Sequence, residues 1–126
     1  MEKLKLRKLK MSDIKSLMKY FVNNKILKDI NLPKKADEIT KSDEIKWLKN
    51  TIKNYKSKKP AEYNLAIIIK KDFIGVIGIH KINYANNNAE VGYWIAEQYW
   101  GKGYASLALR KFLSEIFRKF KFVRLT

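Results

Sequence analysis

The segment Ala89–Ser106, AEVGYWIAEQYWGKGYAS, places a strand-like run, a glycine-containing loop and the start of a helix in immediate succession. The helix-like run that follows the loop, Ala105–Phe120, carries apolar residues at helical spacing. Gly101 and Gly103 let the backbone of the loop approach a ligand closely because they lack a Cβ. The first turn of a helix offers N–H donors and favours negative charge, and Lys102 adds a positive charge. The segment therefore predicts a site for phosphate groups.

Three phosphate-binding patterns compete for this loop. The nucleotide pattern G-x-x-x-x-G-K-[ST] is absent from the chain. The dinucleotide pattern G-x-G-x-x-G fails because Ser106 stands at the third glycine position, and no acidic residue follows the next strand before Thr126. The third pattern, Q/R-x-x-G-x-G/A, is matched in full by Gln98, Gly101 and Gly103. The alternative is that the glycines only shape a strand-to-helix turn.

Outside this segment, hydrophobic spacing and turn residues predict a single α+β domain over residues 1–126. Three strands joined by short turns are expected to be antiparallel neighbours, and a βαβ unit sets the final strand parallel to Ala89–Ala96. Ser12 or Asp13 is the expected N-cap of the first helix, and Ser42 that of the second. In the N-terminal half, the expected elements are a strand at Leu4–Leu9, a helix up to Phe21, an irregular connection from Asn23 to Lys34 with a helical turn near Ile26, and a helix that Ser42 caps and Lys58–Pro60 ends. The buried stripe of this second helix is expected at Ile45, Leu48, Ile52 and Tyr55. The remaining expected elements are strands at Tyr63–Lys70, Phe73–Ile82 and Ala89–Ala96, a helix at Ala105–Phe120 and a strand at Phe122–Leu125.

The cysteine and histidine content limits the chemistry of the chain. There is no cysteine, which excludes a disulfide scaffold, a thiol nucleophile and cysteine-ligated zinc. The single histidine, His80, excludes a multi-histidine metal site within one chain, so no metal is expected. The N-terminus has no apolar signal core and no run reaches membrane-spanning length. We therefore expect a soluble, cytoplasmic protein without a membrane partner.

The net charge of +16 has two interpretations. It can serve a polyanionic partner such as RNA, the ribosome or nucleotide phosphates. It can also be a solvated, lysine-rich surface. The lysines are spread along the chain, with one dense cluster at Lys56–Lys59, which favours the second interpretation.

The residues around the loop resemble the GNAT superfamily of acetyl-CoA-dependent N-acetyltransferases. The segment Ala89–Ser106 is especially similar to the branch that acetylates N-terminal alanine or serine of ribosomal proteins, and to its spermidine-acetylating relatives. The stretch Ala66–Asn83, AIIIKKDFIGVIGIHKIN, and Trp47 fit that branch too. The resemblance covers nearly the whole chain. It implies a GNAT-like mixed sheet, mostly antiparallel with one parallel βαβ unit, flanked by helices.

The resemblance also implies roles for individual residues, with acetyl-CoA as cosubstrate. Backbone N–H groups from Gln98 to Ala105 would hold the pyrophosphate of coenzyme A. The end of the preceding strand would pair through its backbone with the pantetheine arm, and that strand and Phe122–Leu125 would splay apart to form the cleft. A backbone N–H would polarise the acetyl carbonyl near Ile95. The cofactor-binding residues implied are Trp94, Ile95, Ala96, Gln98, Tyr99, Trp100, Gly101, Lys102, Gly103, Tyr104 and Ala105.

Several of these residues also have a plain structural interpretation. Tyr93, Trp94 and Trp100 are expected to pack rather than to contact a substrate. Lys102 is as well explained by solvation as by phosphate binding. His80, alone in an apolar strand, is interpreted as a core or edge histidine, and Trp47 as a core residue.

Acetyl transfer needs a neutral amine beside the thioester, and this requirement bears on the acceptor. An α-amine with a pKa of ~7.7–8.0 is about one tenth neutral at pH 7, whereas a lysine amine with a pKa of ~10.4 is almost fully charged. A site without a strong base therefore suits an N-terminal amine better. Glu90 could draw the proton through water, or simply pair with a lysine on the strand face, and Glu97 is expected on the loop surface.

The chain departs from the family pattern where it stops, at Thr126. Family members usually continue with an asparagine-containing loop, a helix and two strands, so the resemblance implies a domain lacking that last helix and those two strands. The chain is then either a fragment or a short protein that forms a homodimer through its open strand edge. The leading hypothesis is acetyl transfer to the N-terminal α-amine of a ribosomal protein. The alternatives are a polyamine or small-amine acetyltransferase, and an inert acyl-CoA-binding or RNA- or ribosome-associated module.

Overall fold

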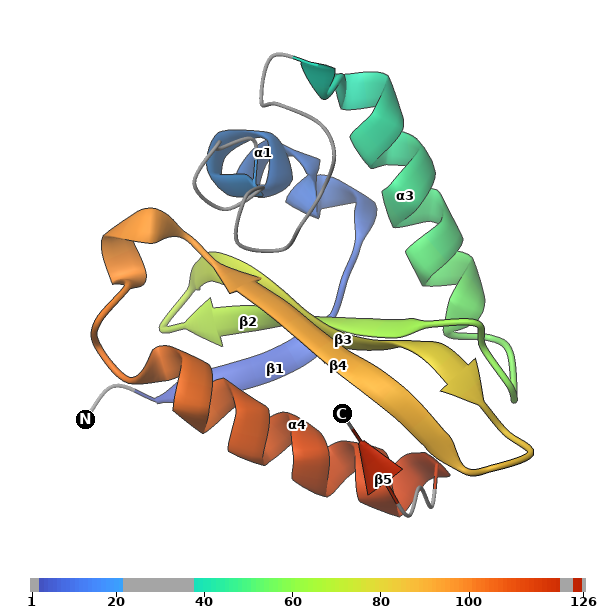
Figure 1. Cartoon of the computed structure of the whole chain (residues 1–126). Helices are drawn as coiled ribbons and strands as arrows, with labels where there is room; N and C mark the ends of the chain where they lie inside the picture. The colour runs from blue at the N-terminus through green and yellow to red at the C-terminus, as the bar shows by residue number, and fades with distance from the viewer. Residues whose placement is uncertain (1–2, 22–37, 121–123, 126) are drawn as a thin grey trace.

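Five strands form one mixed sheet in the order β1-β2-β3-β4-β5 in the computed structural model, which describes residues 3–21, 38–120 and 124–125 (Figure 1). The first four strands are antiparallel neighbours, and β5 runs parallel to β4. The expected α+β architecture with one βαβ unit is therefore confirmed. The strands are β1 (Leu4–Lys8), β2 (Tyr63–Ile69), β3 (Asp72–Asn83), β4 (Asn88–Ile95) and β5 (Arg124–Leu125).

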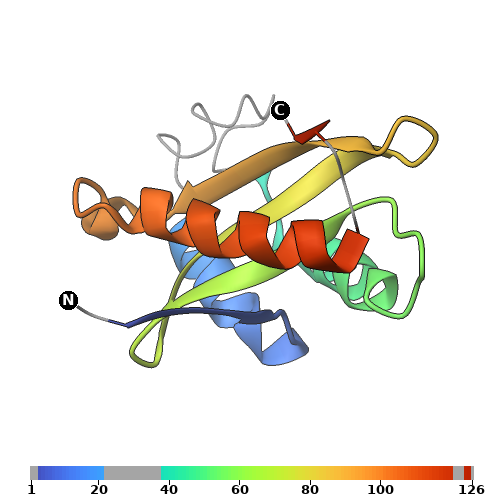
Figure 2. The ribbon, with the colours of Figure 1, turned by 90° about the horizontal axis from the view of Figure 1, so that it is seen from below.

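Helices cover both faces of this sheet. The short helix α1 (Ile14–Ser16) and the longer α3 (Lys41–Asn54) lie on one face, and α4 (Tyr104–Phe120) crosses the other (Figures 1 and 2). A 3-10 turn, η1 (Met11–Asp13), precedes α1, and a π-helical turn, η2 (Leu17–Phe21), follows it. A further 3-10 turn, η4 (Glu97–Tyr99), joins β4 to the glycine loop.

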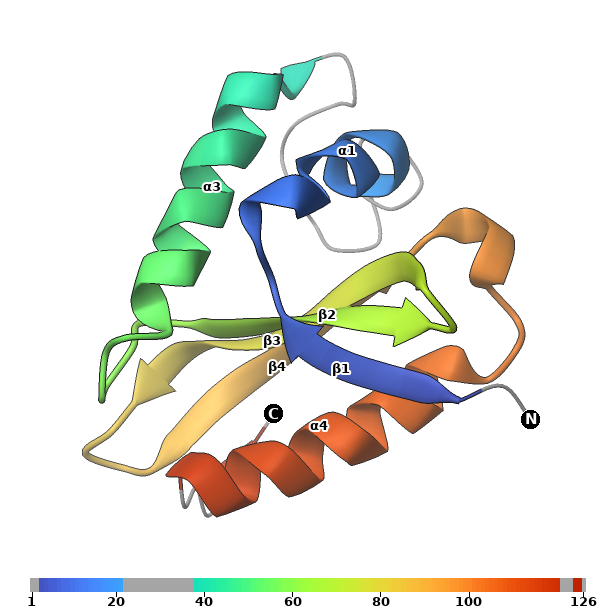
Figure 3. The same cartoon turned by 180° about the vertical axis from the view of Figure 1, so that it is seen from behind.

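The strand β2 is apolar along nearly its whole length because the helices cover both of its sides. Alternate residues enter two separate cores. Leu65, Ile67 and Ile69 pack with Phe112 and Ile116 of α4. On the opposite face, the neighbouring β2 residues, Ala66 and Ile68, pack with Leu9, Leu17 and Leu48. β1 is an edge strand of the sheet and pairs with β2 (Figure 3).

The caps of the N-terminal helices agree with the prediction only in part. The second helix is capped by Thr40, not by Ser42: the Thr40 hydroxyl accepts from the Asp43 N–H, and the Asp43 carboxylate accepts from the Thr40 N–H, each at 3.1 Å. Asp13 is the N-cap of α1, which confirms one of the two predicted positions, but its side chain makes no capping hydrogen bond to this helix. Its carboxylate instead accepts two bonds from Arg7, at 2.8 and 2.9 Å, and one from the Lys10 N–H. The bond to Asp13 raises the pKa of the Arg7 guanidinium.

The buried stripe of α3 agrees with the prediction at Leu48 and differs from it on either side. Glu44, Leu48 and Thr51 are buried, whereas Ile45 and Ile52 are only partly covered. α3 contacts α1, η1, η2 and β2, and these tertiary contacts are not contained in the helical spacing alone. As a consequence, a carboxylate faces the interior of the protein.

Tyr55 ties three separate segments together just beyond α3. Its hydroxyl accepts from the Leu9 N–H at 2.9 Å and donates to the Asn64 carbonyl. Burial raises the pKa of Tyr55 to about 12, so the hydroxyl keeps its proton at physiological pH.

A β-bulge interrupts the pairing of β2 and β3 beside the C-terminal end of β4. Ile68 pairs with Phe73 and Ile67 with Gly75, which leaves Ile74 as the additional residue. The carbonyl of Ile74 then accepts from the Ala96 N–H at 2.7 Å. The bulge therefore fixes the strand end that leads into the glycine loop.

Some expectations lie outside the described residues. These are the irregular connection from Asn23 to Lys34, its helical turn near Ile26, and the start of the last strand at Phe122. Pairing of the open strand edge with a second copy stays a prediction. In the described parts of the chain, no helix is both long enough and apolar enough to cross a membrane.

Candidate functional site

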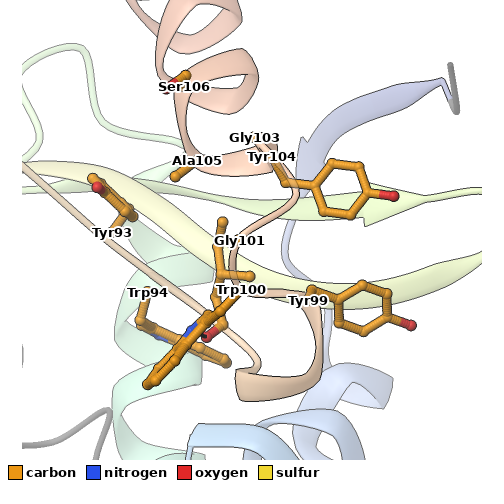
Figure 4. Close-up of a pocket in the computed structure, with 10 residues that line it drawn as sticks. Tyr93, Trp94, Tyr99, Trp100, Gly101, Gly103, Tyr104, Ala105 and Ser106 are labelled. Atoms are coloured by element: carbon orange, nitrogen blue, oxygen red, sulfur yellow. Dashed lines mark hydrogen bonds between the residues drawn. The ribbon is translucent and has the colours of Figure 1, made fainter.

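A pocket of about 480 Å³ opens between the end of β4 and the start of α4 (Figure 4). In Figure 4, Tyr99 and Tyr104 extend to one side together, away from Trp94 and Trp100; the two tyrosine ring centroids are 6.2 Å apart. The glycine loop thus has an aromatic surface on each side. The residues that line the pocket are Tyr93, Trp94, Ile95, Tyr99, Trp100, Gly101, Gly103, Tyr104, Ala105 and Ser106.

The loop conformation requires both of its glycines. Gly101 has a φ of +76° and Gly103 a φ of +79°, a region that L side chains rarely adopt. The carbonyl of Gly103 accepts from the Leu107 N–H at 3.3 Å, which is the first bond of α4. The N–H groups of Ala105 and Ser106 precede this bond, and donors in that position of a helix bind anions. The geometry therefore fits a phosphate group at this helix start.

The outer edge of β4 forms the other part of the pocket. Ala96 donates its N–H to Ile74 on the β3 side, whereas the Ile95 carbonyl accepts from the Trp100 indole at 2.6 Å. Backbone groups alternate along a strand, so those of Tyr93 and Ile95 face away from β3. In the described residues, β5 pairs only with Asn88 and Ala89. The described part of β5 thus leaves the edge of β4 beside the pocket uncovered, as an extended ligand with amide groups requires.

Most residues assigned to the cofactor by resemblance line this pocket, but three do not. Ala96 is fully buried and bonds to Ile74. Gln98 lines a shallow hollow with Lys19, Tyr20 and Glu97. Lys102 is exposed, with its Nζ 5.9 Å from the centre of the Tyr99 ring.

Sequence reasoning missed two lining residues, Tyr93 and Ser106. Tyr93 is 46% exposed, so its interpretation as a packing residue is wrong; Trp100 is 41% exposed. The signal for Tyr93 was its position two residues before Ile95, on the same side of the strand. The signal for Ser106 was its place in the first helical turn.

A second pocket, of about 320 Å³, lies on the α1 and α3 face of the sheet. Trp94 stands between Phe21 and Phe73, with ring centroids 5.2 and 6.2 Å away, and lines both pockets together with Tyr93. The two pockets therefore meet at β4. The residues that line the second pocket are Leu17, Phe21, Glu44, Trp47, Asn64, Val76, Gly78, His80, Gly92, Tyr93 and Trp94.

Titratable side chains gather at the rim of the second pocket, where β3 pairs with β4. His80 faces Glu90 across the strands, with 3.8 Å between His80 Nε2 and Glu90 Oε2, and Lys81 Nζ is 3.3 Å from the same oxygen. The His80 side chain is 45% exposed on an inner strand, so it is neither a core nor an edge-strand histidine. His80 lines the pocket beside Gly92, whereas Glu90 is not among the residues that line it.

Metal chemistry finds no support in the described residues. Residues 3–21, 38–120 and 124–125 contain no group of three or more histidine, aspartate or glutamate side chains placed to hold an ion.

Comparison with known proteins gives one family. A model described as an acetyltransferase (GNAT) domain matches residues 3–126. An uncharacterised N-acetyltransferase, p20, of Bacillus licheniformis is 31% identical over 114 residues, which span 89% of this chain and 61% of that relative.

Two solved structures share the fold over 97% of this chain and over 68% of the length of their own chains. One is a ribosomal L7/L12 α-N-protein acetyltransferase, RimL, in complex with coenzyme A, with 21% identity and a TM-score of 0.82. The other is a spermidine N-acetyltransferase from Vibrio cholerae in complex with coenzyme A and spermine, with 22% identity and a TM-score of 0.80.

Proposed function

Because this chain belongs to the GNAT acetyltransferase family, we propose that it transfers the acetyl group of acetyl-CoA to a primary amine. The observation that carries the proposal is the first pocket, where a positive-φ glycine loop, a helix start and the part of the β4 edge that the described β5 residues leave uncovered meet. The loop and the helix start suit the pyrophosphate of acetyl-CoA, and the strand edge suits its pantetheine arm. The chain spans 61% of the length of its relative p20.

The first pocket would bind two parts of acetyl-CoA, the pyrophosphate and the pantetheine arm. Backbone N–H groups of the loop and of Ala105 and Ser106 would bind the pyrophosphate, supported by the helix dipole. The outward-facing backbone groups of Tyr93 and Ile95 would bond to the amides of the pantetheine arm. The resemblance implied Trp94, Ile95 and Ala96 for this role; we propose Tyr93 and Ile95 instead, because Ala96 donates its N–H to Ile74 on the β3 side.

The acceptor would enter from the second pocket, which meets the first at Trp94. Its amine nitrogen attacks the thioester carbonyl carbon, the carbon–sulfur bond breaks, and the thiolate of coenzyme A leaves. The amine gives up one proton during this step. Orienting the two reactants can supply ~7–11 kcal/mol of the barrier reduction.

We propose a protein N-terminal α-amine as the acceptor, on a ribosomal protein. The α-amine is already partly neutral at pH 7, and RimL acts on such an amine. A polyamine is the second candidate, favoured by the fold shared with a spermidine acetyltransferase. The +16 charge opposes it because the protein repels a polycation.

A panel of amines separates these acceptors. We expect mass-detected acetylation of peptides beginning with serine or alanine, at kcat/KM values above that for spermidine. Faster acetylation of spermidine would favour the second candidate. Acetyl-CoA binding without turnover of any amine, together with strongly salt-dependent RNA binding, would favour an inert module.

Glu90 is proposed to draw the proton from the amine through His80, which lines the pocket and has its Nε2 3.8 Å from Glu90 Oε2. Replacing Glu90 with glutamine is expected to lower kcat about tenfold or more, since general-base catalysis is worth ~10²–10⁴-fold. The Kd of acetyl-CoA should stay unchanged, because Glu90 does not line the first pocket. Steady-state kinetics and calorimetry measure the two quantities.

Glu115→Gln, which removes a carboxylate from α4 on the opposite face, is the matched control. A Glu90→Gln enzyme that turns over like this control would exclude Glu90 from the mechanism.

A further inference from the structure

We propose that Glu44 selects the acceptor by binding one ammonium group in the second pocket, so that this pocket takes a monoamine rather than a polyamine. The inference rests on the proposed function and specifies its substrate class. It also gives a role to a buried carboxylate that the cosubstrate pocket does not use.

The position of Glu44 is the first observation. Glu44 is 7% exposed and lines the second pocket. It lies in the first turn of α3, where the helix dipole favours negative charge. Among the described residues that line this pocket, Glu44 carries the only carboxylate. A ligand with one positive charge therefore finds one negative partner there.

The walls beside Glu44 are the second observation. Phe21, Trp47 and Trp94 line the same pocket. Aromatic rings attract cations through their negative faces, and the attraction grows when water is displaced. A carboxylate within an aromatic pocket is a combination suited to an ammonium group. An acidic ligand would be repelled by the carboxylate.

The positive charge of the rest of the chain disfavours ligands that carry more than one ammonium group. A polyamine brings several positive charges, whereas the described lining residues offer one carboxylate and Glu90 at the rim already lies 3.3 Å from Lys81 Nζ. The remaining charges would face a protein with a net charge of +16. An N-terminal peptide presents one α-ammonium followed by neutral peptide groups. The pocket thus favours the peptide on electrostatic grounds.

Glu44 acts in this account as a binding residue. It attracts the protonated amine into the pocket, and the proton is removed afterwards by the route assigned to Glu90 and His80. Loss of the carboxylate should therefore raise KM for the amine more than it lowers kcat.

The test compares wild-type protein with Glu44→Gln, which keeps the size of the side chain. With a serine-initiated tripeptide, we expect KM to rise about tenfold or more, because one partner of a buried charge pair is lost. The kcat at saturating peptide and the Kd of acetyl-CoA should change less than threefold. Glu115→Gln is the control, and thermal unfolding verifies that each variant is folded.

An equilibrium readout separates charge recognition from a merely structural role. Wild-type protein should bind the free-amine peptide about tenfold tighter than its N-formylated form, and Glu44→Gln should lose that preference. Glu44→Asp, which keeps the charge, should retain part of it. The proposal is overturned if Glu44→Gln keeps both KM and the preference, if Glu44→Asp behaves like Glu44→Gln, or if spermidine is the better substrate.

The outcome is distinguishable from failure of the proposed function. A protein that binds the free amine through Glu44 but transfers no acetyl group would support the pocket and refute the activity. A Glu44→Gln protein that acetylates the peptide as well as the wild type would support the activity and refute the role of the pocket.

Discussion

Replacing both Gly101 and Gly103 with alanine is expected to weaken acetyl-CoA binding about 100-fold. Their φ angles of +76° and +79° cost an L-residue roughly 1–2 kcal/mol each. The free loop would relax to negative φ, and binding would have to restore the original shape. At about 1.4 kcal/mol per tenfold change, a total cost of about 2–4 kcal/mol is a loss of one to three orders of magnitude.

The fold should survive this double substitution. A Cβ built on either glycine meets no atom within 4 Å, and both residues are exposed. Titration calorimetry gives the affinity, and circular dichroism verifies the fold. Gly92→Ala is the matched control, because Gly92 has no positive φ and does not line the first pocket. A folded double variant that binds acetyl-CoA as tightly as this control would contradict the role of the loop.

Replacing Gly75 with alanine is expected to destabilise the protein by about 3 kcal/mol or more, at the upper end of overpacking costs. The added Cβ would lie 2.1 Å from the Trp94 carbonyl oxygen and 3.0 Å from the Ile95 Cα. Both are backbone atoms, so β3 and β4 must separate locally. Trp94 and Ile95 lie at the end of β4 and line the cosubstrate pocket, so the affinity for acetyl-CoA should fall as well.

Chemical denaturation with Gly92→Ala as control measures this effect. A Cβ at position 92 would approach the His80 ring at 3.2 Å, and a side chain can move where a backbone cannot. We expect the control to lose about 1 kcal/mol or less. Equal stability of the two variants would show that the close approach at Gly75 is not a real constraint.

The sheet and the long helices could be predicted from sequence because their signals are local. The unbroken apolar run of β2 and the helical spacing of α4 each specify one element. The cap of α3 could not be predicted, since Thr40 and Ser42 are both good N-caps and only the backbone decides between them. The π-helical turn at Leu17–Phe21 has no local signal of this kind.

The site also combines features with a local sequence signal and features that depend on distant contacts. The glycine loop was predictable because positive φ has a direct signature in Gly101 and Gly103. Which residues of β4 face the pocket depends on its register with β3 and on the bulge at Ile74, which are contacts distant in sequence. The second pocket was missed because it combines Glu44 with His80 and Trp94, from three separate elements. Their proximity exists only in the folded sheet.

Calorimetric titration of the wild-type chain with acetyl-CoA tests the central claim most directly, since every other proposal depends on this pocket. We predict saturable binding of one acetyl-CoA per chain, displaced by free coenzyme A and lost when Gly101 and Gly103 are both replaced with alanine. Absence of binding heat from a folded protein at millimolar acetyl-CoA would contradict it.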